Sequence, residues 1–192
     1  MPKINKKINI NPESKKPEKQ YINQGFSYII NEKGTRTSFE TLAMLHHEGF
    51  ATLAITRLNP KLLVQEMPEL KHAKIYWLTT LEDETAIGPT DIEGIYNIVD
   101  KFVSDNPRSA IILEGLSYLA INASFSQAIL LIQYIKDRVS TSESIFVAPL
   151  NKSALSKKEI EQISEEATVL ESSREIMLEI YKHDEDYLEE ES

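Results

Sequence analysis

The sequence predicts an α/β fold: a three-layer αβα sandwich around a mainly parallel central sheet, followed by an acidic C-terminal helix. Short apolar runs alternate along the chain with segments of helical period. Most of these runs are nearly continuous, which is typical of strands buried on both faces. With 192 residues and 41% hydrophobic content, the chain is long enough to bury one core, so we expect one folded domain.

Five runs rich in β-branched and aromatic residues are predicted to form the sheet, and turn residues or helical segments separate them. They are FSYII from Phe26, ATLAITR from Ala51, KIYWLTT from Lys74, SAIILEG from Ser109 and SIFVAPL from Ser144. A sixth strand is expected at ATVLE, residues 167–171.

The helices are predicted from their start signals and from their apolar stripes. Four hydroxyl residues are each followed three positions later by Glu or Gln, as in a capping box: Thr37 with Glu40, Thr90 with Glu93, Ser124 with Gln127, and Ser156 with Glu159. Asn59 before Pro60 indicates another helix start, and Gly49 indicates a C-terminal cap. Residues 92–103 and 125–139 carry apolar stripes of helical period, so both helices should pack on the sheet.

Charge divides the chain into three parts. Residues 1–25 hold six basic and two acidic residues, residues 26–156 have a net charge of -4, and residues 157–192 have a net charge of -9. We therefore predict a basic disordered arm at 1–24, an α/β domain at 25–171 and an acidic helix at 172–192. The acidic body argues against nucleic acid as a partner, because binding to nucleic acid requires cations against the phosphates.

The sequence indicates a cytoplasmic protein. It has no cysteine, which excludes a disulfide framework and thiolate metal sites. No apolar run reaches the length of a membrane span, and the basic N-terminus lacks the apolar stretch of a signal peptide.

The stretch YIINEKGTRTSFETLAML, residues 28–45, has the strand, Gly-containing turn and helix of a phosphate-binding loop. When Gly34 is aligned with the second glycine of the G-x-x-x-x-G-K-[ST] pattern, Ile29 stands at the first glycine, Thr35 at the lysine and Arg36 at the hydroxyl. Glu32 would also oppose an anion in the turn. The sequence therefore predicts no triphosphate binding of the P-loop kind.

Ligands of parallel α/β sheets bind at the carboxyl ends of the strands. The ligand-binding candidates at that edge are Arg36, Arg57, Asn59 and Glu114. Arg57 and Asn59 have a second interpretation, as parts of a braced helix-start turn. Glu114 follows an apolar strand as the magnesium-ordering carboxylate of nucleotide hydrolases does, but its position also suits hydrogen bonds to neighbouring loop amides.

The residues identify no catalytic site, metal site or cofactor. His46 and His47 are adjacent, and adjacent helical side chains point about 100° apart, so they are poorly placed to share an ion. A favourable position near the negative end of a helix explains them better.

The C-terminal segment from Ser173 has an apolar stripe among carboxylates. The candidate partner-binding residues on it are Ile176, Ile180, Tyr187 and Leu188. Two interpretations stay open: a final helix packed on its own domain, or a projecting helix that a partner reads through its apolar anchors.

From about Gly25 to Glu171 the sequence resembles the archaeal family called domain of unknown function 835. The resemblance is carried, in order, by GFSYIINE, GFATLAITRLNP, KIYWLT, TDIEGI, IILEGLSYLAINASF and IKDRVSTSESIFVAPLNKSAL. It implies a degenerate relative of the KaiC and RecA type ATPase core, found beside sensory modules or KaiC-like partners. It supplies no catalytic residue.

Together these observations predict a non-catalytic signalling or scaffolding adaptor that acts through protein partners, with KaiC-like ATPases or sensory and motility components suggested by the resemblance. Self-association into a homo-oligomer stays open. The alternative is a nucleotide or anion sensor that binds at the strand ends. A hydrolase centred on Glu114 is a third and weaker hypothesis.

Overall fold

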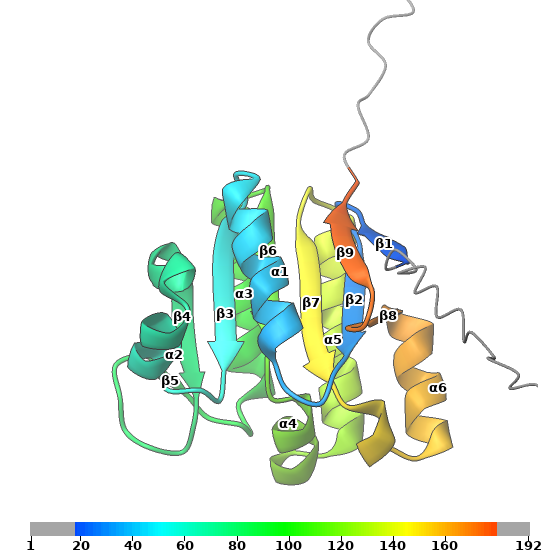
Figure 1. Cartoon of the computed structure of the whole chain (residues 1–192). Helices are drawn as coiled ribbons and strands as arrows, with labels where there is room; N and C mark the ends of the chain where they lie inside the picture. Colours follow the sequence, from blue (N-terminus) through cyan, green and yellow to red (C-terminus); the bar gives the residue numbers. More distant parts are fainter. Residues whose placement is uncertain (1–17, 180–192) are drawn as a thin grey trace, which may run out of the picture.

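The computed structural model describes residues 18–179 and confirms the three-layer α/β fold (Figure 1). The strands are β1 Lys19–Ile22, β2 Ser27–Asn31, β3 Ala51–Thr56, β4 Lys74–Leu78, β5 Ala86–Ile87, β6 Ser109–Leu113, β7 Ile145–Leu150, β8 Thr168–Glu171 and β9 Glu175–Leu178. The helices are α1 Arg36–His47, α2 Pro60–Glu66, α3 Ile92–Asp105, α4 Leu116–Asn122, α5 Phe125–Ser140 and α6 Lys157–Glu166, with 3₁₀ turns η1 Pro68–His72 and η2 Lys152–Ala154.

Seven strands form a parallel sheet in the order β5-β4-β3-β6-β7-β2-β8. The six predicted strands are all present, and the short edge strand β5 is an addition. α1 carries the chain from β2 across the sheet to β3, so the first and second strands of this sheet do not pair. Because every strand runs the same way, the loops that follow the strands meet at one edge.

Alternating side chains of the central strands pack into two separate hydrophobic cores, one on each face of the sheet. On one face, Ile29 and Phe146 pack with apolar residues of α3, α4, α5 and α6. On the other face, Ile30 and Val147 pack with α1, α2 and η1. Burial on both faces explains why the strands read as continuous apolar runs.

Most of the helix boundaries follow the start and stop signals in the sequence. Ser156 and Glu159 form a reciprocal capping box, Ser124 accepts the amide of its predicted partner, and Asn59 caps α2 with Pro60 in the first position. Gly49 has a φ of 86° just after α1, as a C-terminal cap requires.

Of the four predicted capping boxes, only Ser156 with Glu159 is reciprocal, Ser124 with Gln127 has the hydroxyl-to-amide bond alone, and the other two are wrong. Helix α3 is capped by Asp91, which accepts the Gly94 amide, and not by Thr90. Helix α1 begins at Arg36, so Thr37 already lies inside the helix. In both cases a neighbouring carboxylate accepts the free amides in place of the predicted hydroxyl.

The ends of the described chain differ from the prediction. Residues 19–22 form β1, which pairs in parallel with β9 in a separate two-stranded sheet, so order begins before the predicted boundary at 24. The segment at 175–178 is a strand and not the predicted helix, and Ile176 packs against the core on the α1 face. The other three residues of the predicted partner-binding stripe, Ile180, Tyr187 and Leu188, lie outside the described residues.

Polar side chains fasten this small sheet to the edge of the large one. The side chain of Gln20 donates to the carbonyl of Glu171 at 2.8 Å and accepts its amide at 2.9 Å. The Glu171 carboxylate accepts hydrogen bonds from Asn31 at 2.7 Å and from Lys152 at 2.9 Å. These two hydrogen bonds hold the pKa of Glu171 below the ordinary value of 4.5, and the bond from Asn31 has the larger effect.

We expect Glu171→Gln to reduce the unfolding free energy at neutral pH. The variant should also lose less stability than the unsubstituted protein when the pH is lowered. Because folding lowers the pKa of Glu171, its contribution is complete above the unfolded value near 4.5 and disappears as the pH falls through the lower folded value. Urea midpoints measured from neutral pH to below pH 4.5 test this. Glu82→Gln, at an exposed loop position, controls for the loss of one charge. Equal pH profiles for the two variants would contradict the prediction.

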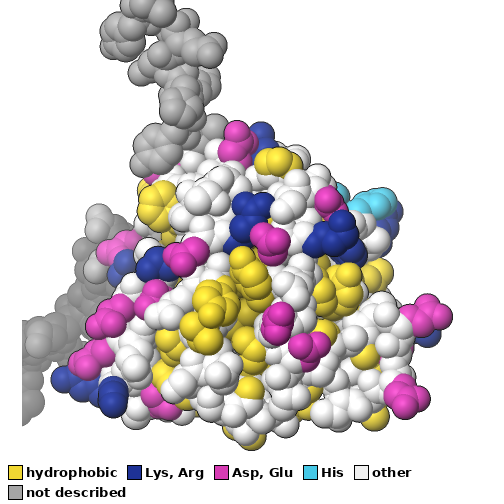
Figure 2. Space-filling model, turned by 180° about the vertical axis from the view of Figure 1, so that it is seen from behind, with side chains coloured by type: hydrophobic (Ala, Val, Ile, Leu, Met, Phe, Trp, Pro, Cys, Tyr) yellow, Lys and Arg dark blue, Asp and Glu magenta, His cyan; other side chains and the backbone are white. Residues whose placement is uncertain are grey.

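The outer surface of α3 and α5 is partly apolar. Figure 2, the view from behind, shows hydrophobic side chains gathered near the centre of this face, below a cluster of opposite charges. The rings of Tyr96 and Tyr134 lie 5.4 Å apart, and Arg138 of α5 forms an ion pair with Asp100 of α3 at 2.7 Å.

None of the helices within residues 18–179 has the length and apolar character needed to cross a membrane.

Candidate functional site

The loops after β2, β3, β6 and β7 surround a cavity of about 220 Å³ at the carboxyl edge of the sheet, which we call the strand-end cavity. Its charged lining residues are Glu32, Lys33, Arg57 and Glu114, and Asn151 and Tyr118 complete its polar wall. Parallel strands bring these loops together, as the sequence predicted for this edge. Two of the four predicted ligand-binding residues, Arg57 and Glu114, are among them.

The carboxylate of Glu32 occupies the N-terminus of α1. It accepts hydrogen bonds from the amides of Thr37 at 2.9 Å and Ser38 at 3.0 Å, and from the Ser38 hydroxyl at 2.5 Å. Glu32 is only 8% exposed. These amides and the positive end of the helix dipole are the groups with which helix N-termini bind phosphate. An internal anion therefore takes the position that an external anion would need.

Glu114 braces the turn between β3 and α2. Its carboxylate accepts the hydroxyl of Thr56 at 2.9 Å and the amide of Arg57 at 2.7 Å. Hydrogen bonding to loop amides was one of the interpretations open for this residue, and the structure shows one such bond, from the Arg57 amide. The Arg57 guanidinium lies over the ring of Tyr118, 3.8 Å from its centroid, in a cation–π contact.

Gly115 allows this close packing at the start of α4. Its φ of 118° lies in the left-handed region. A Cβ at this position would lie 2.9 Å from the Leu78 side chain and 3.0 Å from that of Arg57. Glycine is therefore required here both by backbone conformation and by space.

The other two predicted ligand-binding residues do not line the cavity. The Arg36 side chain is directed along α1 to Glu40, at 2.7 Å. Asn59 caps α2 by accepting the amide of Lys61 at 3.0 Å. Both departures have local causes, because a helix-start asparagine is used by its own helix and i,i+4 pairing draws Arg36 to Glu40 along the helix surface.

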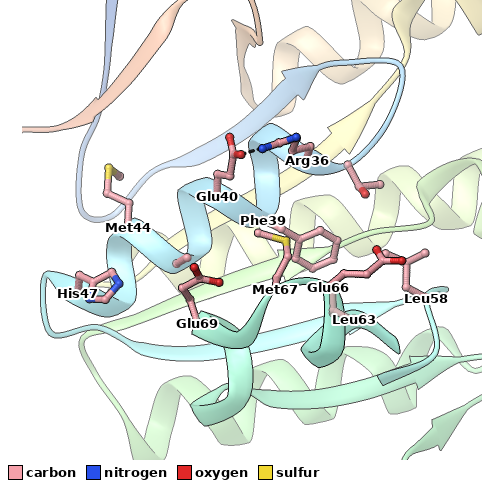
Figure 3. Close-up of a pocket in the computed structure, with 12 residues that line it drawn as sticks. Arg36, Phe39, Glu40, Met44, His47, Leu58, Leu63, Glu66, Met67 and Glu69 are labelled. Carbon is pink, nitrogen blue, oxygen red and sulfur yellow. Dashed lines mark hydrogen bonds and ion pairs between the residues drawn. The ribbon is translucent and has the colours of Figure 1, made fainter. Parts of the chain in front are cut away.

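Arg36 and Glu40 instead border a second and larger hollow of about 670 Å³ between α1 and the α2–η1 segment (Figure 3). We call this hollow the α1–α2 groove. Its lining comprises Thr35, Arg36, Phe39, Glu40, Ala43, Met44, His47, Leu58, Leu63, Glu66, Met67 and Glu69. The groove could not be predicted from the sequence, because it forms between two segments whose relative position depends on tertiary packing.

The strand-end cavity combines two cations with two carboxylates that are already hydrogen-bonded. Within residues 18–179, no three His, Asp or Glu side chains gather closely enough to hold a metal ion. Glu32 is the residue whose role the sequence did not reveal, although an acidic residue between a buried strand and a helix is a signal for an N-terminal cap.

Comparisons with solved structures find the same fold at low sequence identity. The flagellar accessory protein FlaH from Methanocaldococcus jannaschii is 14% identical, with a TM-score of 0.57, over 78% of this chain and 72% of that one. A KaiC-like protein from Pyrococcus horikoshii OT3 is 12% identical, with a TM-score of 0.55, over 77% and 73% of the two chains. Among curated protein sequences, none matches this chain.

A family model described as "Protein of unknown function (DUF835)" matches residues 31–167. This span holds five strands of the large sheet, β3 to β7, the last residue of β2, and all six helices. It therefore includes Glu32, Glu114 and the other lining residues of the strand-end cavity. The chain belongs to this family, DUF835, and shares its α/β fold with FlaH and with the KaiC-like protein.

Proposed function

We propose that the protein is a non-catalytic adaptor that uses a KaiC-like fold as a scaffold for protein–protein contacts. The systems that suit it are archaeal sensory, motility or KaiC-like ATPase assemblies. Similarity to a flagellar accessory protein and to a KaiC-like protein supports this choice at the level of the fold.

The single observation that carries the proposal is the position of Glu32. Its buried carboxylate accepts two amides and one hydroxyl at the N-terminus of α1. A nucleotide phosphate at this point would have to displace the carboxylate and then remain beside it. In the aligned loop, Thr35 stands at the position of the P-loop lysine, so no cation from that position offsets the repulsion.

The alternative function is an anion or nucleotide sensor at the strand ends. Lys33 and Arg57 support it, because both cations line the cavity. The observations against it are the two carboxylates in the same cavity and the stacking of Arg57 on Tyr118, which already engages that cation. The adaptor is therefore the better supported function.

We expect no rise in melting temperature with ATP, ADP, GTP or cyclic dinucleotides, with or without Mg²⁺. A ligand at free concentration L that binds only the native state stabilises it by RT ln(1 + L/Kd), so the melting temperature keeps rising once the ligand concentration exceeds Kd. A concentration-dependent rise that disappears in Arg57→Ala would favour the sensor and overturn the adaptor. Lys61→Ala, on the exposed surface of α2, is the matched control for a lost cation.

The proposal that the protein binds a protein partner is tested by affinity purification from cells that express the tagged full chain. Truncation after Glu179 removes the candidates Ile180, Tyr187 and Leu188 and leaves β9 in place, unlike a truncation at residue 173. The expected result is one stoichiometric partner that binds the full chain and is lost on truncation after Glu179. Failure of the full chain to retain any stoichiometric partner would contradict the adaptor.

A further inference from the structure

The α1–α2 groove has an apolar floor with exposed apolar side chains at its edge. Phe39 of α1 and Leu63 of α2, which are 1% and 2% exposed, form the buried base of the floor, and Met67 points toward them (Figure 3). Leu58 at one end is 38% exposed, and Leu62 on the neighbouring surface of α2 is 58% exposed. Exposed apolar side chains beside a groove are typical of a binding site for a protein segment.

The rim of the groove is acidic. Glu40, Glu66 and Glu69 stand along it, and only Glu40 has a cation, Arg36, at 2.7 Å. Among residues 18–179 no lysine, arginine or histidine forms an ion pair with Glu66 or Glu69. The chemistry of the groove therefore suits a basic segment with apolar side chains.

The chain itself contains such a segment. Residues 1–17, MPKINKKININPESKKP, hold five lysines and one glutamate, a net charge of +4 from side chains, and the isoleucines at 4, 8 and 10. These residues lie outside the described part of the chain. Their charge is opposite to that of the rim, and their isoleucines match the floor.

The starting point of this segment is close enough to reach the groove. Lys19 pairs with Glu175 in the small sheet, and Glu175 borders a hollow together with Glu40 and Met44. Those two residues of α1 also line the groove, on the other flank of the helix. Seventeen residues extend to roughly 56 Å at about 3.3 Å each, whereas crossing one helix requires about 10 Å.

We propose that residues 1–17 bind in the α1–α2 groove of the same molecule, with isoleucines on the apolar floor and lysines against Glu66 and Glu69. This inference goes beyond the adaptor function and does not depend on it. It gives the groove a resident occupant, which any external segment of similar chemistry has to displace.

The absence of native cysteines allows a clean spin-label experiment on the full chain. A nitroxide attached at Ile8→Cys should broaden the amide signals of Met44 and Met67 strongly and leave those of Glu161 and Ile163, on the opposite face of the sheet, unchanged. Uniformly weak broadening would overturn the proposal. Broadening found only when a labelled copy is mixed with an isotope-enriched unlabelled copy would also overturn it, in favour of a contact between two molecules.

Charge reversal separates specific docking from general attraction. Glu66→Lys/Glu69→Lys should lower the equilibrium constant for docking about tenfold. Each of the two lost ion pairs is exposed and accounts for a factor of about three. Glu161→Lys/Glu165→Lys on α6 makes the same change in net charge and should have little effect. The double substitution Ile4→Asp/Ile10→Asp changes only residues outside the described fold, and it should also release residues 1–17 from the groove. Equal broadening in all three variants would refute the assignment.

Discussion

Glu32→Ala is expected to destabilise the protein by about 2–4 kcal/mol. The substitution removes the acceptor for the Thr37 and Ser38 amides and leaves the fully buried Ser38 hydroxyl without its hydrogen bond. It also removes a negative charge from the positive end of α1. Urea unfolding followed by circular dichroism measures the loss.

A control and a rescue define the cause. Glu40→Ala, which breaks only an exposed pair with Arg36, should change stability by no more than about 0.5 kcal/mol. Phosphate or sulfate should restore part of the lost stability in Glu32→Ala but not in Glu40→Ala, because an external anion can then bind the free amides. Equal losses in the two variants would show that the buried carboxylate is not an anionic cap.

Gly115→Ala is expected to cost about 2–3 kcal/mol. A non-glycine residue is strained at a φ of 118°, and the added Cβ would lie within 3.0 Å of the Leu78 and Arg57 side chains. Displacement of Arg57 should also weaken its contact with Tyr118. Thermal or urea unfolding gives the stability change, and the environment of the Tyr118 ring can be followed by NMR.

Gly34→Ala is the matched substitution in the same strand-end region. A Cβ at this position meets no atom within 4 Å, and its φ is not in the left-handed region. The variant should therefore be neutral or slightly stabilised, because alanine reduces the freedom of the unfolded chain. A loss at Gly34 as large as that at Gly115 would contradict the argument from local geometry.

The large sheet could be predicted because its information is local. SAIILEG and SIFVAPL each contain a continuous apolar run, AIIL and IFVAPL, which is typical of a strand covered on both faces. The capping pair of Ser156 and Glu159 is local as well. The β1–β9 pair is different, since Lys19 and Glu175 are brought together only by the completed fold. EIML is also too short an apolar run to distinguish a strand from a helix by period.

The candidate site was predictable in its location but not in its chemistry. The carboxyl edge of the sheet follows from parallel strands, and Arg57 and Glu114 do line the cavity there. The direction of each side chain is set by competing partners within a few ångströms. Arg36 is drawn to Glu40, Asn59 is used by α2, and Glu32 turns back onto α1. Such choices depend on distances that the sequence does not contain.

The parallel pairing of β1 with β9 also determines how the fold meets a mechanical load. The N-terminal side leaves the pair at Lys19 and the C-terminal side leaves it at Leu178, at opposite ends of two strands in register. A force applied through the two chain ends pulls these strands past each other lengthwise, so that their hydrogen bonds bear tension together and do not open one by one. The small sheet would therefore resist such a force in shear, with its hydrogen bonds loaded in parallel.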